Sequence, residues 1–305
     1  FPQNEDLIFL QIRSAELQGQ TERMVALLEN IAQRREAEGR IAENIGLYEK
    51  LLELRPNYPA YLQKLADAHV ARHDIKTACQ WLETLARHYI AEEQPTEAIQ
   101  VLERVLDYEP QMTPLRVLLV DQLVKVGEYE RAKAEVATIL NAQMDNSDFV
   151  GALQTARKWL EIEPESIEAH EWLARVHQEQ ANNEEAVKEL RLAAGLAQAQ
   201  GDLARTKSLL GRARFLSPED PSIRRDVIEL LKSAGEVQEA CFELTNLAEL
   251  YFTAGDSESG EKALLEILEI NPLPGARLEV AAHLANRGCT ATAARLYLEA
   301  AKSAE

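Results

Sequence analysis

The sequence predicts an all-α fold, a solenoid of about 17 helices in which a unit of three helices is repeated. Three observations predict it. The helix-forming residues Ala, Leu, Glu, Gln and Arg dominate the 305 residues, whereas only 13 glycines and 11 prolines occur. Apolar residues return at helical spacing along the chain. Five prolines lie 54 residues apart, namely Pro56, Pro110, Pro164, Pro218 and Pro272.

The stretch from residue 57 to residue 110 shows how three helices follow one another. Apolar stripes with i, i+3, i+4, i+7 spacing cover residues 62–69, 75–89 and 98–106. Polar residues separate the stripes, and Pro95 can occupy the first turn of the third helix, where an N–H has no partner in any case. The recurring proline closes that helix, because it disfavours helical geometry in the residue before it and cannot continue the helix.

Further positions keep the interval of 54 residues and predict one continuous array. A stacked core requires small or apolar residues at a fixed position within the repeated interval, which we call a phase, since each unit buries its face only against its neighbours. One such column consists of Ala78, Ala132, Ala186 and Ala240. We therefore predict a single solenoid over residues 1–305, with units 3–56, 57–110, 111–164, 165–218 and 219–272 and a partial unit 273–305.

Part of each unit resembles the tetratricopeptide-repeat family. In Cys241–Pro272, the residues that fit the family pattern are Leu244, Leu247, Ala248, Tyr251, Gly255, Gly260, Leu264, Ile267 and Pro272. Pro59–Glu92 fits the pattern as well. The family's unit is a helix pair of about 34 residues, whereas each unit here carries one additional helix. The resemblance implies a right-handed superhelix with an extended surface for binding a protein or a peptide.

The charge of the chain limits the partners that it can bind. Acidic residues outnumber basic ones 51 to 33, which gives a net charge of −18. This field opposes a general nucleic-acid role and docking on an anionic membrane, and it favours basic protein partners. We find no apolar run of about 18 residues that would insert into a membrane. The sequence therefore predicts a protein or peptide partner, and the charge favours a basic one.

The cysteines and the first residues bear on localisation. Three widely separated cysteines, Cys79, Cys241 and Cys289, form neither a disulfide framework nor a zinc pattern and suit a reducing compartment. We expect a cytoplasmic protein. The chain begins with Phe1 rather than Met, which is the start of a processed chain or a fragment, so an N-terminal signal that was removed remains an alternative.

We find no pattern of catalytic, cofactor-binding or metal-binding residues and predict that the chain is not an enzyme. No nucleophile elbow, phosphate loop or dinucleotide fingerprint occurs. His69 and His73 lie four residues apart, a spacing that could place two imidazoles on one helix face for a metal ion. A core position and a turn position explain them better, because Leu123 and Gly127 occupy the same phases one unit later.

One basic stretch interrupts this acidic protein, and it is the predicted partner-binding site. Arg214 occupies a phase that other units fill with leucine. One interpretation is an arginine whose stem covers apolar surface while its charge reaches water. The alternative interpretation is that this basic stretch contacts an acidic partner or a second copy of the chain. The predicted site consists of Arg205, Arg212, Arg214, Arg224 and Arg225.

We predict a non-enzymatic scaffold or adaptor that binds a peptide or protein on the solenoid surface. A first alternative is a self-associating structural or filament-forming element, in which Leu296, Tyr297 and Leu298 meet another copy and make a homo-oligomer. A second alternative is the regulatory repeat arm of a larger protein.

Overall fold

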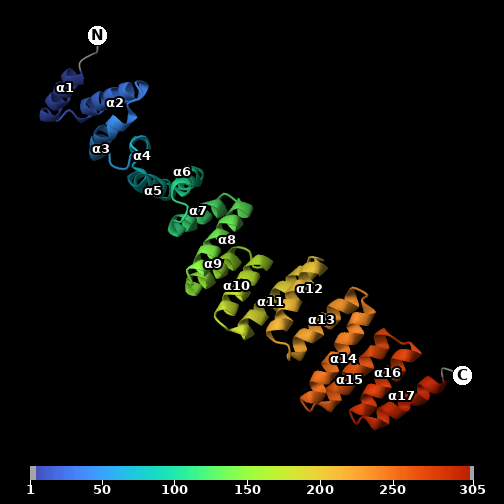
Figure 1. The fold of residues 1–305 in the computed structure, drawn as a ribbon. Coiled ribbons are helices and arrows are strands. Elements are labelled where there is room, and N and C mark those ends of the chain that lie inside the picture. Colours follow the sequence, from blue (N-terminus) through green and yellow to red (C-terminus); the bar gives the residue numbers. More distant parts are fainter. Residues whose placement is uncertain (1–4, 303–305) are drawn as a thin grey trace. The chain divides into compact units, whose positions relative to one another are not determined.

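The computed structural model describes residues 5–302, and in this range it consists of helices without a β-strand. The chain divides into two compact units, unit 1 up to Ala142 and unit 2 from Gln143 onward. Within the described range there are 17 α-helices and one 3₁₀-helix (Figure 1), which confirms the predicted all-α repeat fold and the number of helices. No helix in this range is both long enough and apolar enough to cross a membrane.

Unit 1 contains the first seven α-helices, the 3₁₀-helix and most of α8. From α1 to α7 each α-helix packs against the next one along the chain, and the loops between them are short. The helices are α1 (Glu5–Leu17), α2 (Thr21–Ala37), η1 (Ile41–Asn44), α3 (Ile45–Leu54), α4 (Pro59–Ala71), α5 (Ile75–Ala91), α6 (Pro95–Tyr108), α7 (Thr113–Lys125) and α8 (Tyr129–Asp145), the last of which contains the division between the units.

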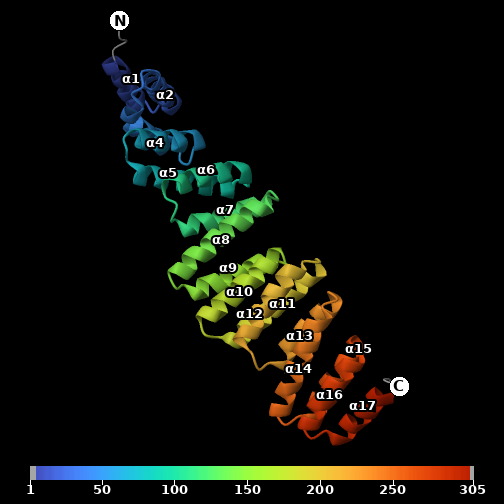
Figure 2. The same cartoon turned by 45° about the vertical axis from the view of Figure 1, so that its right-hand side comes forward.

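Unit 2 contains the remaining helices, and consecutive helices again lie side by side (Figure 2). They are α9 (Phe149–Ile162), α10 (Ile167–Glu179), α11 (Asn183–Ala199), α12 (Leu203–Leu216), α13 (Pro221–Ser233), α14 (Val237–Thr253), α15 (Ser257–Ile270), α16 (Pro274–Asn286) and α17 (Thr290–Lys302).

The helix ends follow the repeated prolines. α3, α6, α9, α12 and α15 each end two residues before one of them, as predicted from the restriction that proline places on the preceding backbone. α4, α7, α10 and α13 begin at Pro59, Thr113, Ile167 and Pro221, so that the interval of 54 residues is kept by the helices. The boundaries of the six units proposed above stay a prediction.

The turns between helices repeat a left-handed backbone conformation at two positions of each three-helix set. His73 (φ 62°), Gly127 (φ 79°) and Ala181 (φ 57°) hold the turn after the first helix. Glu93 (φ 56°) and Gly255 (φ 83°) belong to the turn after the second helix. A left-handed residue reverses the chain at a helix end, and glycine adopts it without a steric penalty. His73 is thus a turn residue, as its phase predicted.

The core consists of leucine and alanine from facing helices. In unit 2, one buried cluster joins α14, α15 and α16 through Leu264, Leu247 and Leu284, each at most 1% exposed. In unit 1, Leu102 and Leu65 are fully buried. Leu102 and Leu264 occupy the same position of the repeat and form one core column. The predicted column is also fully buried, and it consists of Ala78, Ala132, Ala186 and Ala240.

Candidate partner-binding site

The five arginines of the predicted site lie on α12 and α13, and each has a carboxylate partner within unit 2. Arg205 pairs with Glu168 and Glu171, Arg212 with Glu171, Arg214 and Arg224 with Glu243, and Arg225 with Glu266. The Arg224 pair joins consecutive helices, and the other pairs join helices that are two apart along the chain. The basic stretch is therefore largely neutralised by the fold itself, and its role in partner binding stays a prediction.

One of these ion pairs belongs to a brace that recurs in other parts of the chain. Arg224 donates to Glu243 at 2.9 Å and to the carbonyl of the repeated proline six residues before it at 3.5 Å. Arg116 makes the same two contacts in unit 1, with Glu135 and with its own repeated proline. Between them in sequence, the ring of His170 lies 2.6 Å from the corresponding glutamate. The brace fixes the start of one helix onto the next.

Arg214 is an addition to this brace. Its Nη1 donates to Glu243 at 2.5 Å, so that this carboxylate, in a residue only 8% exposed, is shared by two guanidinium groups. In the described part of the chain, the other two glutamates of the brace, Glu135 and Glu189, each have a single basic partner. The leucines at the phase of Arg214 are Leu52, Leu106, Leu160 and Leu268.

Arg214 stands at the edge of an open groove between α12 and α14, with buried apolar side chains of α13 at its floor. Two hollows of about 400 and 590 Å³ share Gly211, Arg214, Phe242 and Glu243 and together form this groove. We call it the α12–α14 groove and define it by Gly211, Arg214, Phe215, Phe242, Glu243 and Asn246.

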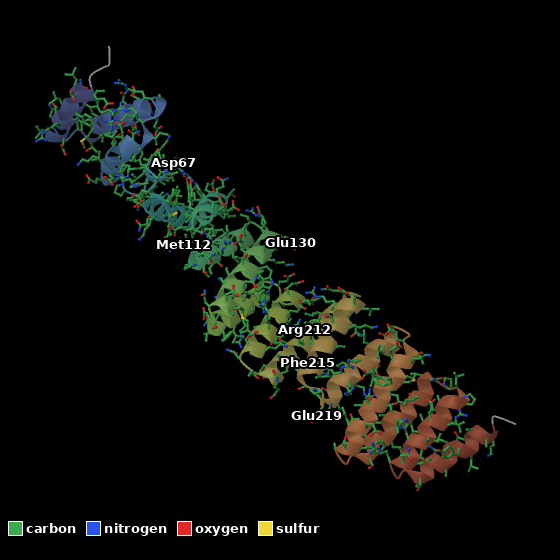
Figure 3. All side chains as sticks on the ribbon, in the orientation of Figure 1. Asp67, Met112, Glu130, Arg212, Phe215 and Glu219 are labelled. Atoms are coloured by element: carbon green, nitrogen blue, oxygen red, sulfur yellow. The ribbon has the colours of Figure 1, made fainter. Side chains whose placement is uncertain are left out.

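Two phenylalanines border the groove and are widely exposed. Phe215, near the end of α12, is 85% exposed, and Phe242 of α14 is 65% exposed. Figure 3 labels Arg212, Phe215 and Glu219 along the end of α12 and the turn after it. Gly211 adds no side chain to the groove wall, and the space beside it is open, because a Cβ at this position would have no atom within 4 Å. The site thus combines exposed aromatic surface, an open helix face and a shared arginine pair.

Comparison of the repeated sets would have found these residues in the sequence. Phe215 lies at a phase where the other sets carry an acid, as in Glu161 and Glu269. Gly211 lies at the phase of Glu103 and Arg157. The phase of Phe242 holds Gln80, Ala134 and Lys188. Sequence reasoning singled out Arg214 at this place but missed the two phenylalanines beside it.

The residues predicted for self-association differ in exposure. Leu296 is 3% exposed and packs in the core of unit 2, whereas Tyr297 is 42% and Leu298 64% exposed. Two further apolar side chains of the same region, Leu273 and Leu278, are also exposed. A contact with another copy would therefore use Tyr297 and Leu298 rather than Leu296.

The histidine pair and the cysteines have structural surroundings. His69 is buried, and its Nδ1 lies 3.1 Å from Asp74, the residue that caps α5. Burial raises the pKa of the Cys79 thiol, which disfavours the reactive thiolate. No group of three or more His, Cys, Asp or Glu side chains within residues 5–302 is arranged to hold a metal ion.

The helix-pair packing and turns described above define the class of the protein, a helical repeat protein. Residues 89–149 match the family model of the tetratricopeptide repeat. Over this segment the chain is similar to the tetratricopeptide repeat, the family that the sequence pattern resembles. No curated protein matches the chain.

Several solved structures are similar at low identity. YrrB, described as a tetratricopeptide-repeat protein with an unusual peptide-binding site, is 16% identical, with 65% of this chain and 96% of YrrB covered and a TM-score of 0.22. The Rap conjugation gene regulator of plasmid pLS20, in complex with the Phr* peptide, is 14% identical, with 86% and 75% covered and a TM-score of 0.31. A signal transduction ATPase with a tetratricopeptide-repeat sensor from Pyrococcus horikoshii is 12% identical, with 88% and 53% covered and a TM-score of 0.35.

Proposed function

We propose that the chain is a non-enzymatic interaction scaffold that binds a peptide or a segment of another protein in the α12–α14 groove. The observation that carries the proposal is the pair of exposed phenylalanines, Phe215 and Phe242, beside a groove that Gly211 leaves open. Water-exposed aromatic side chains are unfavourable for an isolated protein, and a partner that covers them gains the hydrophobic free energy.

The dimensions and chemistry of the groove support a segment rather than a small-molecule ligand. The two hollows have volumes of about 400 and 590 Å³, and both are open to solvent. Aromatic residues and arginine are the side chains that most often dominate the binding energy of protein interfaces. The groove supplies both kinds, and its floor of buried leucines on α13 is held by the core of unit 2.

Site-specific photo-crosslinking in cells of the natural source tests this proposal. A photoreactive phenylalanine analogue replaces Phe242, and the matched control places it at Val150 of α9, which is 66% exposed in the same unit. We expect discrete adducts from position 242 that the additional substitution Phe215→Glu removes. Identical adduct patterns from both positions would refute a specific binding groove.

A second candidate function, self-association, is favoured by the exposed Tyr297 and Leu298. Two copies that cover these side chains would gain apolar burial. Light scattering of the purified chain across concentrations tests it, with the double variant Tyr297→Ser, Leu298→Ser as the comparison. A molar mass that rises for the native chain but not for the variant would support it, and a constant mass in both would exclude it.

A further inference from the structure

Resting on the proposed function, we infer that the α12–α14 groove takes a partner segment in which an apolar side chain is followed closely by a carboxylate. The apolar side chain packs between Phe215 and Phe242. The carboxylate accepts hydrogen bonds from Arg214 and Arg224. The proposal thus names an acidic, hydrophobic segment as the occupant of the groove, although the protein as a whole is acidic.

The charge balance within the groove carries this inference. Arg214 and Arg224 share the single carboxylate of Glu243, so this end of the groove holds one positive charge in excess. The recurring brace elsewhere has one base for one acid, as in Arg116 with Glu135. The excess charge is therefore specific to this place and comes from Arg214.

The other charged groups that line the groove determine the direction of the segment. Lys207 is bound by Glu236 at 2.5 Å, and the two cancel one another. Glu239 lines the groove further from the turn between α12 and α13 and would repel a second acid there. The carboxylate of the segment consequently lies at the Arg214 end, beside the amide of Asn246.

The guanidinium groups retain unused donors for a second acceptor. Arg214 uses its Nη1 in the contact with Glu243, and a guanidinium carries five N–H groups. The Nε of Arg224 is buried, so the donors within reach of a partner are the remaining N–H groups of Arg214 and those on the Nη atoms of Arg224. Charge-assisted hydrogen bonds to a carboxylate are about twice as strong as neutral ones. An incoming carboxylate thus completes a network that Glu243 alone leaves unfinished.

The long-range field of the protein gives the site selectivity. The net charge of −18 repels acidic segments from most of the surface. An acidic segment is therefore accepted only where local bases outnumber acids and where apolar contact adds to the binding energy. A segment with an acid but no apolar side chain would gain too little.

The repeat supplies variants that test the inference without endangering the fold. Arg214→Leu installs the residue that Leu160 and Leu268 already provide at this phase, and Glu243 keeps Arg224 as a partner. Phe215→Glu installs the acid found in Glu161 and Glu269. The matched control is Arg287→Gln, since Arg287 is a basic residue of the same unit but binds Glu249 and does not line the groove.

Selection from a phage library of random 12-residue peptides on the full chain provides the experiment. We expect enriched peptides with an apolar residue within two positions of an acid. Their affinity, measured by fluorescence anisotropy on synthetic copies, should fall about tenfold in Arg214→Leu, fall as much or more in Phe215→Glu, and stay unchanged in Arg287→Gln.

Five results would overturn the inference and remain distinguishable from a failure of the scaffold proposal. Enriched peptides that lack acids, or that Arg214→Leu binds equally well, refute the acidic class but leave the groove. Peptides that Phe215→Glu binds equally well refute the groove but leave a scaffold with another site. An absence of enrichment refutes the inference and leaves the crosslinking result to decide the scaffold. A dimer that Arg214→Leu dissociates would identify a second copy as the occupant instead.

Discussion

Leu264→Asp tests the packing on which the whole stack depends. Leu264 lies in the middle of α15, is 1% exposed and belongs to the cluster that joins α14 and α16. Removing the leucine alone should cost about 2–5 kcal/mol, as other core truncations do. The aspartate adds the cost of placing a polar group without a partner in an apolar site, about 1–3 kcal/mol. The sum approaches the whole stability of a typical domain, about 5–15 kcal/mol.

We expect this variant to lose helical circular dichroism and to melt at a much lower temperature than the native chain. Leu102→Asp in unit 1 should behave in the same way, because Leu102 is fully buried. The matched controls are Leu298→Asp and Leu10→Asp, which carry the same substitution at side chains 64% and 66% exposed. Unchanged helicity and melting in both buried variants would refute the assignment of the core columns.

Three further predictions concern caps, turns and charge. Ser166→Ala should destabilise unit 2 by about 1–3 kcal/mol in urea unfolding, because it removes the cap of α10 and leaves the buried indole N–H of Trp159 unpaired; a loss below about 0.5 kcal/mol would contradict it. Gly235→Ala should destabilise by about 1 kcal/mol at its φ of 73°, whereas Gly195→Ala, in helix α11 with open space around it, should stabilise by about as much; changes of the same sign would refute the turn assignment. Burial opposes the ionisation of Glu266, but hydrogen bonds from Lys232 and Arg225 outweigh it and hold the pKa of Glu266 below its ordinary value of 4.5. Its contribution to stability is therefore complete above this pH and is lost as the pH falls toward the lower folded value, so Glu266→Gln should make acid unfolding less steep below about pH 4.5; an unchanged acid limb would contradict it.

The helices and their ends were predictable from the sequence because local physics decides them. Each repeated proline restricts the backbone before it, and the helix ends two residues earlier whatever surrounds it, as at Pro110 and Pro218. Helical spacing of leucine and alanine likewise decides which face is buried. His73 was recognised as a turn residue from its phase, and its positive φ has the same cause as that of Gly127.

The ion pairs were not predictable, because they join residues that are far apart along the chain. Arg205 meets Glu168, which lies 37 residues before it, only through the packing of α12 on the preceding helices. A run of basic residues in the sequence therefore overstated the charge that remains available. Among the five arginines, an excess of positive charge remains only where Arg214 and Arg224 share Glu243.

The groove was missed for a different reason. Phe215 lies three residues before a repeated proline, where the local sequence indicates only the end of a helix and does not indicate exposure. The acids at the same phase in other sets, such as Glu53 and Glu269, mark this as a surface position. An exposed aromatic residue there departs from its own repeat, and such departures are where a repeat protein carries function.

The most direct measurement for the central claim is the affinity of the selected 12-residue peptide for the Gly211→Glu variant, by fluorescence anisotropy. Glu49 and Glu103 occupy the same phase, so the variant should fold, and the new side chain extends into the space that Gly211 leaves open. We predict at least about a tenfold loss of affinity, since the carboxylate fills the groove and repels the acid of the peptide. Affinity within twofold of the native chain would contradict the claim that this groove binds the partner.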